Sequence, residues 1–166
     1  MNNNKSFDVI IVGLGPIGAV LANLLGRLSL SVLVLEKNKK IHPSPRAIHF
    51  DGEVMRIFQN AGLAEEVAKI ARPSQKGMHF LGANGELLLV RKGKVGLGDQ
   101  GWENSWYFFQ PDLERVLQNA LKRYSNVVIR KNETLEKIDH RKACVQVMTL
   151  RGRQKTKNNS TKVKMS

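Results

Sequence analysis

The chain has 166 residues, of which 42% are hydrophobic, and it carries a formal net charge of +13. This length corresponds to about one globular domain with a buried core. No apolar run is long enough to span a bilayer, and the polar start precedes the first apolar segment directly. We therefore expect a cytoplasmic protein with no membrane partner. The single cysteine, Cys144, excludes an internal disulfide, and the scattered histidines have no metal-ligand spacing, so no metal site is expected.

The positive charge is concentrated at the end of the chain. Six of the 27 Lys and Arg residues lie in residues 151–166, which contain no acidic residue. This segment has no aromatic residue and no apolar periodicity, so we expect a folded domain in residues 1–150 and a disordered basic tail after it. No nucleic-acid-binding motif accompanies the charge. A specific nucleic-acid partner is therefore not expected.

The hydrophobic pattern predicts an α/β protein with a parallel sheet. Continuous apolar runs predict buried strands, and apolar residues at helical spacing predict amphipathic helices. In chain order these segments are a strand at 7–12, a helix at 16–28, a strand at 31–35, a helix between Asp51 and Gly62, a helix at 64–71, a β-hairpin at 78–81 and 86–90, a strand at 106–109, a helix at 110–124, a strand at 127–129, and two alternating strands at 134–139 and 143–149.

A glycine-rich turn, GLGPIG at residues 13–18, lies between the first strand and the first helix. Gly13 would allow a tight turn, Gly15 would let the backbone approach a pyrophosphate, and Gly18 would let the helix pack closely on the sheet. Glu36 follows the second strand, where a carboxylate accepts hydrogen bonds from ribose hydroxyls. The pattern indicates a Rossmann-like dinucleotide-binding unit. The alternative is an α/β unit in which the glycines serve packing only.

Three motifs in the right order resemble the class A flavoprotein aromatic hydroxylases, near the phenol-hydroxylase-like enzymes. The motifs are GxGPxG with its distant Glu36, the segment PRAIHFDGEVMRIFQNAGL at residues 45–63, and FQPDLE at residues 109–114. The likeness extends from Phe7 to about Leu150. It implies a Rossmann-like FAD/NAD(P)-binding domain with an inserted β-hairpin, incomplete at its carboxy end.

The resemblance also implies FAD as the cofactor and NAD(P)H as the electron donor. Carried over by position, it implies these cofactor-binding residues: Gly13, Gly15, Pro16 and Gly18 at the pyrophosphate, Glu36 at the adenosine ribose, Arg46 on FAD, and Gln110 near the ribityl-phosphate portion. A guanidinium suits phosphate and polar flavin edges, and an amide suits hydroxyls. The alternatives are a solvated loop arginine at position 46 and a structural turn residue before Pro111.

The implied reaction is the hydroxylation of a phenolic compound such as 3-(3-hydroxyphenyl)propionate, with NAD(P)H reducing the flavin and oxygen supplying the hydroxyl group. No catalytic residue is assigned by the sequence. The likeness ends near Leu150, before the family's later FAD segments, so we expect a fragment or a shortened reading frame that is inactive alone. Two alternatives stay open: another FAD oxidoreductase of the same fold, and a non-catalytic FAD- or nucleotide-binding remnant.

Overall fold

The computed structural model describes residues 6–74, 77–91, 96–142, 144–152 and 159–164. The chain forms two compact units. The first unit comprises Met1–Pro43 with Glu114–Ser166, and the second unit comprises Ser44–Leu113. Each unit has its own sheet and core, and each is described separately below.

A three-stranded parallel sheet lies at the centre of the first unit. Its strands are β2 (Val9–Val12), β3 (Val32–Glu36) and β9 (Val127–Lys131), in the order β2-β3-β9. The four apolar residues of β3 are all buried, because this strand lies between the other two and is covered on both faces. The predicted parallel sheet is thereby confirmed.

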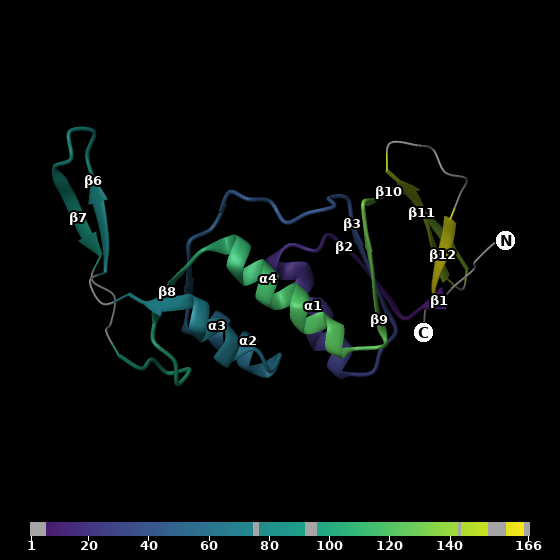
Figure 1. Ribbon diagram of the computed structural model, residues 1–166, viewed down its shortest axis with the longest axis horizontal. Helices are drawn as coiled ribbons and strands as arrows, with labels where there is room; N and C mark the ends of the chain where they lie inside the picture. The colour runs from purple at the N-terminus through teal and green to yellow at the C-terminus, as the bar shows by residue number, and fades with distance from the viewer. Residues whose placement is uncertain (1–5, 75–76, 92–95, 143, 153–158, 165–166) are drawn as a thin grey trace. The chain divides into compact units, whose positions relative to one another are not determined.

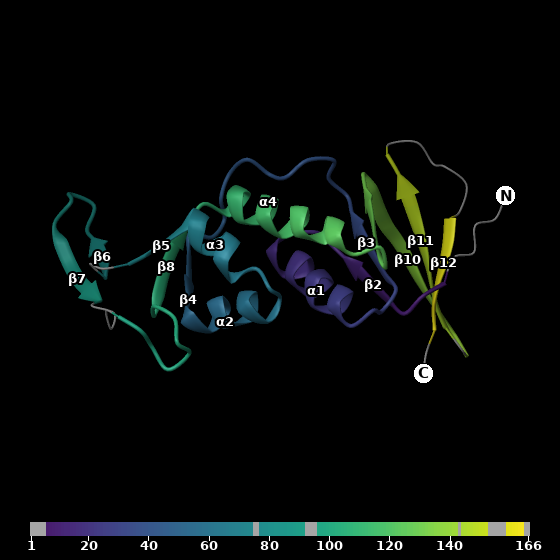
Figure 2. The same ribbon diagram turned by 60° about the horizontal axis from the view of Figure 1, so that its bottom comes forward.

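Two helices cover one face of this sheet (Figures 1 and 2). They are α1 (Pro16–Arg27) and the part of α4 (Gln110–Ala120) that belongs to the first unit. The Asn23 side chain on α1 is fully buried, and its Nδ2 donates to the carbonyl oxygens of Ala19 at 2.8 Å and Leu117 at 3.0 Å. This amide therefore ties α1 to α4. A short 3₁₀ helix, Leu121–Arg123, follows α4 and leads to β9.

A second sheet covers the opposite face of β2-β3-β9 (Figures 1 and 2), in the order β1-β12-β11-β10. Its strands are β1 (Ser6–Phe7), β10 (Glu133–Arg141), β11 (Cys144–Arg151) and β12 (Asn159–Lys164). The last two predicted strands are confirmed as β10 and β11, which pair antiparallel with each other. Residue Cys144 is partly exposed.

The structure differs from the expected disordered tail at β12. Residues Asn159–Lys164 pair antiparallel with β11 and parallel with β1. Backbone pairing of this kind does not depend on apolar side chains, which is why composition did not reveal it. Residues 153–158 of the expected tail lie outside the described residues.

The predicted first strand is split in two at Asp8. The Asp8 carboxylate accepts hydrogen bonds from the backbone N–H and the hydroxyl of Ser31, at 2.8 and 2.6 Å. Because Asp8 is held in this way, the residues before it join one sheet as β1 and those after it join the other as β2. Among the described residues, no helix has the length and hydrophobicity needed to cross a membrane.

The second unit is built around a small antiparallel sheet with strand order β4-β8-β5 and two short helices. Its elements are β4 (His49–Asp51), α2 (Gly52–Asn60), α3 (Ala64–Ile70), β5 (Ala71–Pro73), β6 (Met78–Leu81), β7 (Leu87–Arg91) and β8 (Ser105–Phe108). The predicted helix after Asp51 is confirmed as α2, and Asp51 caps it, since its Oδ1 accepts a hydrogen bond from the Val54 N–H at 3.0 Å. Gly62 follows α2 with φ +67°. The rings of Phe50, Phe58 and Trp106 pack together in the core.

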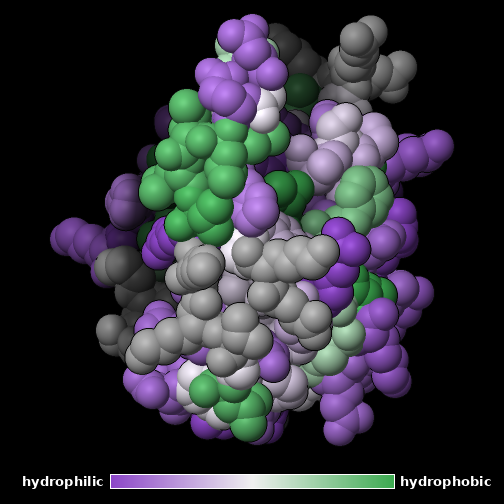
Figure 3. Space-filling view, turned by 90° about the vertical axis from the view of Figure 1, so that its left-hand side faces the viewer, coloured by the Kyte–Doolittle hydropathy of each residue, from purple (hydrophilic) through white to green (hydrophobic). Residues whose placement is uncertain are grey.

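The predicted β-hairpin is confirmed as β6 and β7, which form a two-stranded sheet and pair with no other strand in the described part of the chain. It carries five large apolar side chains that are exposed, namely Phe80, Leu81, Leu87, Leu88 and Leu89. Figure 3 shows the side of the molecule that carries the hairpin, where green apolar atoms gather beside purple polar ones.

Candidate functional site

The glycine turn in the first unit has the tight geometry that the sequence predicts. Gly13 has φ +102°, a conformation that side-chain-bearing residues rarely adopt, and its N–H donates to the Leu35 carbonyl at 2.7 Å. A Cβ on Gly18 would overlap the Gly13 carbonyl oxygen and would lie 3.4 Å from the Ile11 side chain. Glycine at positions 13 and 18 is therefore required by the turn itself.

Gly15 differs from these two glycines because nothing restricts it sterically. It is the N-cap residue of α1 with φ −72°, and a Cβ built on it would meet no atom within 4 Å. Pro16 occupies the first turn, and the Ala19 N–H donates to the Gly15 carbonyl at 2.9 Å. The amino end of α1 thus faces open space with its partial positive charge, as an anionic group requires.

Glu36 ends β3 beside this turn. Its Oε2 accepts a hydrogen bond from the Leu14 N–H at 2.8 Å, and its Oε1 accepts one from the Asn38 N–H at 2.7 Å. Each carboxylate oxygen can accept a further hydrogen bond. The side chain is therefore held in place by the backbone and can still receive hydroxyl donors, which fits the sugar of a dinucleotide.

Two residues that sequence reasoning missed also hold this turn. The Gln118 Nε2 on α4 donates to the Leu14 carbonyl at 3.0 Å, and the Lys131 Nζ on β9 donates to Gln118 Oε1 at 2.7 Å. Gln118 lies 104 residues after Leu14 in the chain, and no local motif marks such a contact.

In the second unit, the structure brings Arg46 and Gln110 together. The Gln110 side chain is 4% exposed, and its Oε1 accepts hydrogen bonds from the backbone N–H groups of Arg46 at 2.8 Å and Ala47 at 3.0 Å. The Arg46 side chain is exposed to solvent. Gln110 therefore fixes the backbone of the Arg46 segment, while the guanidinium is left accessible to a ligand.

The second unit also contains a cavity of about 400 Å³ beside β4 and β8. Its wall includes His49, Arg91, Ser105 and Tyr107. The His49 Nε2 lies 2.6 Å from the Ser105 Oγ, and the His49 and Tyr107 rings meet edge to face at 5.7 Å between centroids. The cavity thus combines aromatic surface with hydrogen-bonding groups, as small-molecule sites do.

The residues of the first unit fit the adenosine diphosphate portion of FAD. The open Gly15, the amino end of α1 and the Glu36 carboxylate offer an anion site next to a hydroxyl acceptor.

Comparison with known sequences gives two informative relatives. The chain is 36% identical over 155 residues to a 3-(3-hydroxy-phenyl)propionate/3-hydroxycinnamic acid hydroxylase of Burkholderia cenocepacia (strain HI2424), covering 92% of this chain and 28% of the relative. It is 38% identical over 135 residues to a probable NADH-specific resorcinol 4-hydroxylase of Rhodococcus jostii (strain RHA1), covering 81% of this chain and 25% of the relative. The chain therefore spans about a quarter of the length of these relatives.

Among solved structures, the p-nitrophenol 4-monooxygenase PnpA from Pseudomonas putida DLL-E4 matches with a TM-score of 0.81 and 27% identity, covering 96% of this chain and 40% of PnpA. The flavin-dependent monooxygenase PieE, solved with FAD and substrate, matches with a TM-score of 0.82 over 97% of this chain and 29% of PieE. At 20% identity, this second match shows the fold alone.

A family model described as "FAD binding domain" matches residues 6–162. The match continues past Leu150, near which we expected the likeness to end, and it includes part of β12. The motifs, the parallel sheet with its glycine turn, and this match agree. The chain belongs to the FAD binding domain family, whose cofactor is FAD.

Proposed function

We propose that this chain is the FAD-binding portion of an NAD(P)H-dependent flavin monooxygenase that hydroxylates phenolic compounds such as 3-(3-hydroxyphenyl)propionate. The names of the two relatives support the reaction and the substrate class. The observation that carries the proposal is the turn after β2, where Gly13 and Gly18 are required by the backbone and Gly15 faces open space.

In this proposal the first unit holds the adenosine diphosphate portion of FAD. The N–H groups at the start of α1, in the turn formed by Gly13, Gly15, Pro16 and Gly18, would bind the pyrophosphate. Glu36 would accept hydrogen bonds from the ribose hydroxyls. In the second unit, Arg46 would contact FAD, and Gln110, which holds the Arg46 backbone, would lie near the ribityl-phosphate portion of the cofactor.

When bound, FAD supplies the redox chemistry, while the protein orients the reactants and excludes water. The cavity in the second unit supports an aromatic substrate, because its volume of about 400 Å³ can hold a substituted ring. The His49–Ser105 pair could exchange a hydrogen bond with a phenolic hydroxyl. The hydroxylation itself would need residues that correspond to the rest of the relatives' length.

Flavin binding by the 166-residue chain tests the cofactor assignment. We expect a purified, folded chain to quench the fluorescence of added FAD saturably. Gly15→Asp should abolish binding, because its carboxylate would occupy the proposed pyrophosphate site while the open space lets the chain fold. Asn119→Asp, on the exposed side of α4, adds the same charge and should bind FAD normally. A folded chain that binds no FAD would contradict the proposal.

The histidine ring signals in a nuclear magnetic resonance titration test the substrate cavity. Adding 3-(3-hydroxyphenyl)propionate should shift the His49 signals and leave the exposed His79 and His42 signals unchanged. Equal shifts at all histidines would indicate nonspecific binding, and no shift would remove the cavity from the proposal.

A further inference from the structure

Side chains hold both backbone polar groups of Leu14, and these groups belong to the two successive peptides that flank this residue. Its N–H donates to Glu36 Oε2 at 2.8 Å, and its carbonyl accepts from Gln118 Nε2 at 3.0 Å. Leu14 is 1% exposed, so water is excluded from its side chain as well. Of the two peptides between the first two glycines, Glu36 therefore holds Gly13–Leu14 and Gln118 holds Leu14–Gly15.

Gln118 is itself held in one orientation. Its Oε1 accepts a hydrogen bond from the Lys131 Nζ at 2.7 Å, which directs Nε2 toward Leu14 and opposes a flip of the amide. Lys131 on β9 is the register partner of Glu36 on β3. The contacts thus form a closed ring from Leu14 through Glu36, the paired strands, Lys131 and Gln118 back to Leu14.

This ring fixes the direction of the Gly15 N–H. In a trans peptide, the carbonyl and the next N–H point in opposite directions. No cis peptide occurs among the described residues, so the Leu14 carbonyl faces Gln118 and the Gly15 N–H faces away from it. The Lys131 ammonium donates to Gln118, and Gln118 donates to the Leu14 carbonyl. This chain of hydrogen bonds also polarises the Leu14–Gly15 peptide and strengthens the Gly15 N–H as a donor.

We propose that Gln118 and Lys131 are positioning residues for the FAD pyrophosphate, because they orient the Leu14–Gly15 peptide so that the Gly15 N–H donates to a phosphate oxygen. This inference rests on the proposed FAD site in the glycine turn. Neither residue belongs to the GxGxxG motif, and both act through the peptide of Leu14.

Three variants separate the contacts. Gln118→Met keeps the length of the side chain and removes both hydrogen bonds. Gln118→Glu keeps an acceptor for Lys131 but places a carboxylate against the Leu14 carbonyl. Lys131→Met leaves Gln118 in place and removes its partner. Asn119→Ala, which removes an exposed amide from the same helix, is the matched control.

Affinity for FAD and for ADP is measured on the full chain by fluorescence and calorimetry. We expect Gln118→Met and Gln118→Glu to weaken both ligands by about tenfold, the effect of losing one good hydrogen bond. Lys131→Met should weaken both by a smaller factor, and Asn119→Ala should leave both unchanged. An equal loss for ADP and FAD is expected because the two ligands share the diphosphate.

Amide hydrogen exchange without ligand provides a readout that a general structural role would not move. Gln118→Met should accelerate exchange at the Leu14 N–H, which donates to Glu36, and leave the N–H groups within α1 unchanged. Acceleration throughout α1, or failure of all three variants to fold, would assign these residues to stability and overturn the proposal. Unchanged FAD and ADP affinity in a folded Gln118→Met chain would also overturn it.

The outcomes distinguish this inference from the proposed function. If the wild-type chain binds FAD and Gly15→Asp does not, but the Gln118 variants bind normally, only the role of Gln118 and Lys131 is wrong. If the folded wild-type chain binds neither FAD nor ADP, the proposed site itself fails, and this inference fails with it.

Discussion

Gly18 lies so close to the Gly13 carbonyl that a side-chain carbon on Gly18 would overlap the carbonyl oxygen. The contact joins the first turn of α1 to the chain that leaves β2, and it lets the helix begin directly at the sheet edge. Gly15, between these two glycines, has open space around it. The glycines of one motif are thus required for different physical reasons, and substituting them should have different consequences.

Gly18→Ala should destabilise the fold, whereas Gly15→Ser should not. The added methyl at position 18 meets backbone that cannot move independently, so we expect a loss of about 1–3 kcal/mol in the free energy of unfolding. Serine is a favoured N-cap residue and suits the extended backbone at position 15. Urea unfolding measures both variants. A Gly18→Ala chain as stable as wild type, or an unfolded Gly15→Ser chain, would contradict this interpretation.

Glu36→Gln should weaken FAD binding without unfolding the chain. Both carboxylate oxygens accept backbone N–H groups, and an amide replaces one acceptor with a donor. We expect affinity for FAD and ADP to fall about tenfold, which corresponds to about 1.4 kcal/mol. Fluorescence titration measures the loss, with Glu53→Gln on the exposed surface of α2 as the control. Unchanged affinity would show that Glu36 only supports the Leu14 backbone.

Sequence patterns predict the glycine turn and the parallel strands because their residues are neighbours in the chain. The turn, its helix and the strand that ends at Glu36 lie within the first 36 residues, so local spacing defines them. From the sequence alone, Gln118 is a polar residue of a predicted helix, and Lys131 lies just after the predicted strand at 127–129. Their link to Leu14 depends on how α4 and β9 pack in three dimensions, which local patterns do not report.

Gln110 shows a related limit. Its position before Pro111 predicts a helix start, and the family motif implies a cofactor contact, but neither reveals that its Oε1 accepts the N–H groups of Arg46 and Ala47. At β12 the limit is compositional, because a polar, basic segment pairs through its backbone with β11 and β1, and this pairing needs no apolar pattern.

Gln110→Met should loosen the segment around Arg46. The substitution leaves two backbone N–H groups without their acceptor, so the segment should open more often and be cut faster by trypsin after Arg46. Cleavage after Lys69, in α3, provides an internal reference within the same unit. Equal acceleration at both sites would indicate general unfolding, and no acceleration would show that other contacts hold the Arg46 segment.

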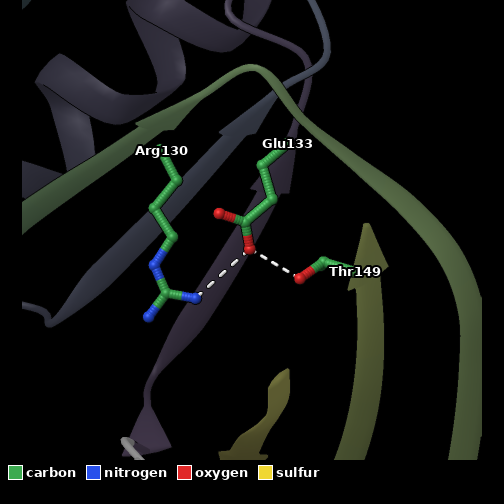
Figure 4. A network of polar contacts seen from close by, with 3 residues as sticks. All are labelled: Arg130, Glu133 and Thr149. Carbon is green, nitrogen blue, oxygen red and sulfur yellow. Dashed lines mark hydrogen bonds and ion pairs between the residues drawn. The ribbon is translucent and has the colours of Figure 1, made fainter. Parts of the chain in front are cut away.

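The first unit also contains a buried carboxylate that lies away from the glycine turn. Glu133 at the start of β10 is 3% exposed, and its Oε1 accepts a hydrogen bond from the Thr149 hydroxyl on β11 at 2.5 Å. Arg130 Nη1 lies 3.4 Å from the same oxygen (Figure 4). A buried charge with such partners is stable only while they remain, because an unpaired carboxylate in the interior is costly.

Thr149→Val should therefore destabilise the chain although it preserves the side-chain shape. Removing the hydroxyl deprives the Glu133 carboxylate of its buried donor, and we expect a loss of about 1–3 kcal/mol in the free energy of unfolding. Thr134→Val on β10 makes the same chemical change at an exposed side chain and should alter stability by no more than about 0.5 kcal/mol. Urea unfolding of both variants gives the comparison.

Adding Glu133→Leu to Thr149→Val should recover stability, because no buried carboxylate is then left without a hydrogen-bond donor. If Thr149→Val and Thr134→Val have the same small effect, the Arg130 guanidinium alone is sufficient to stabilise Glu133.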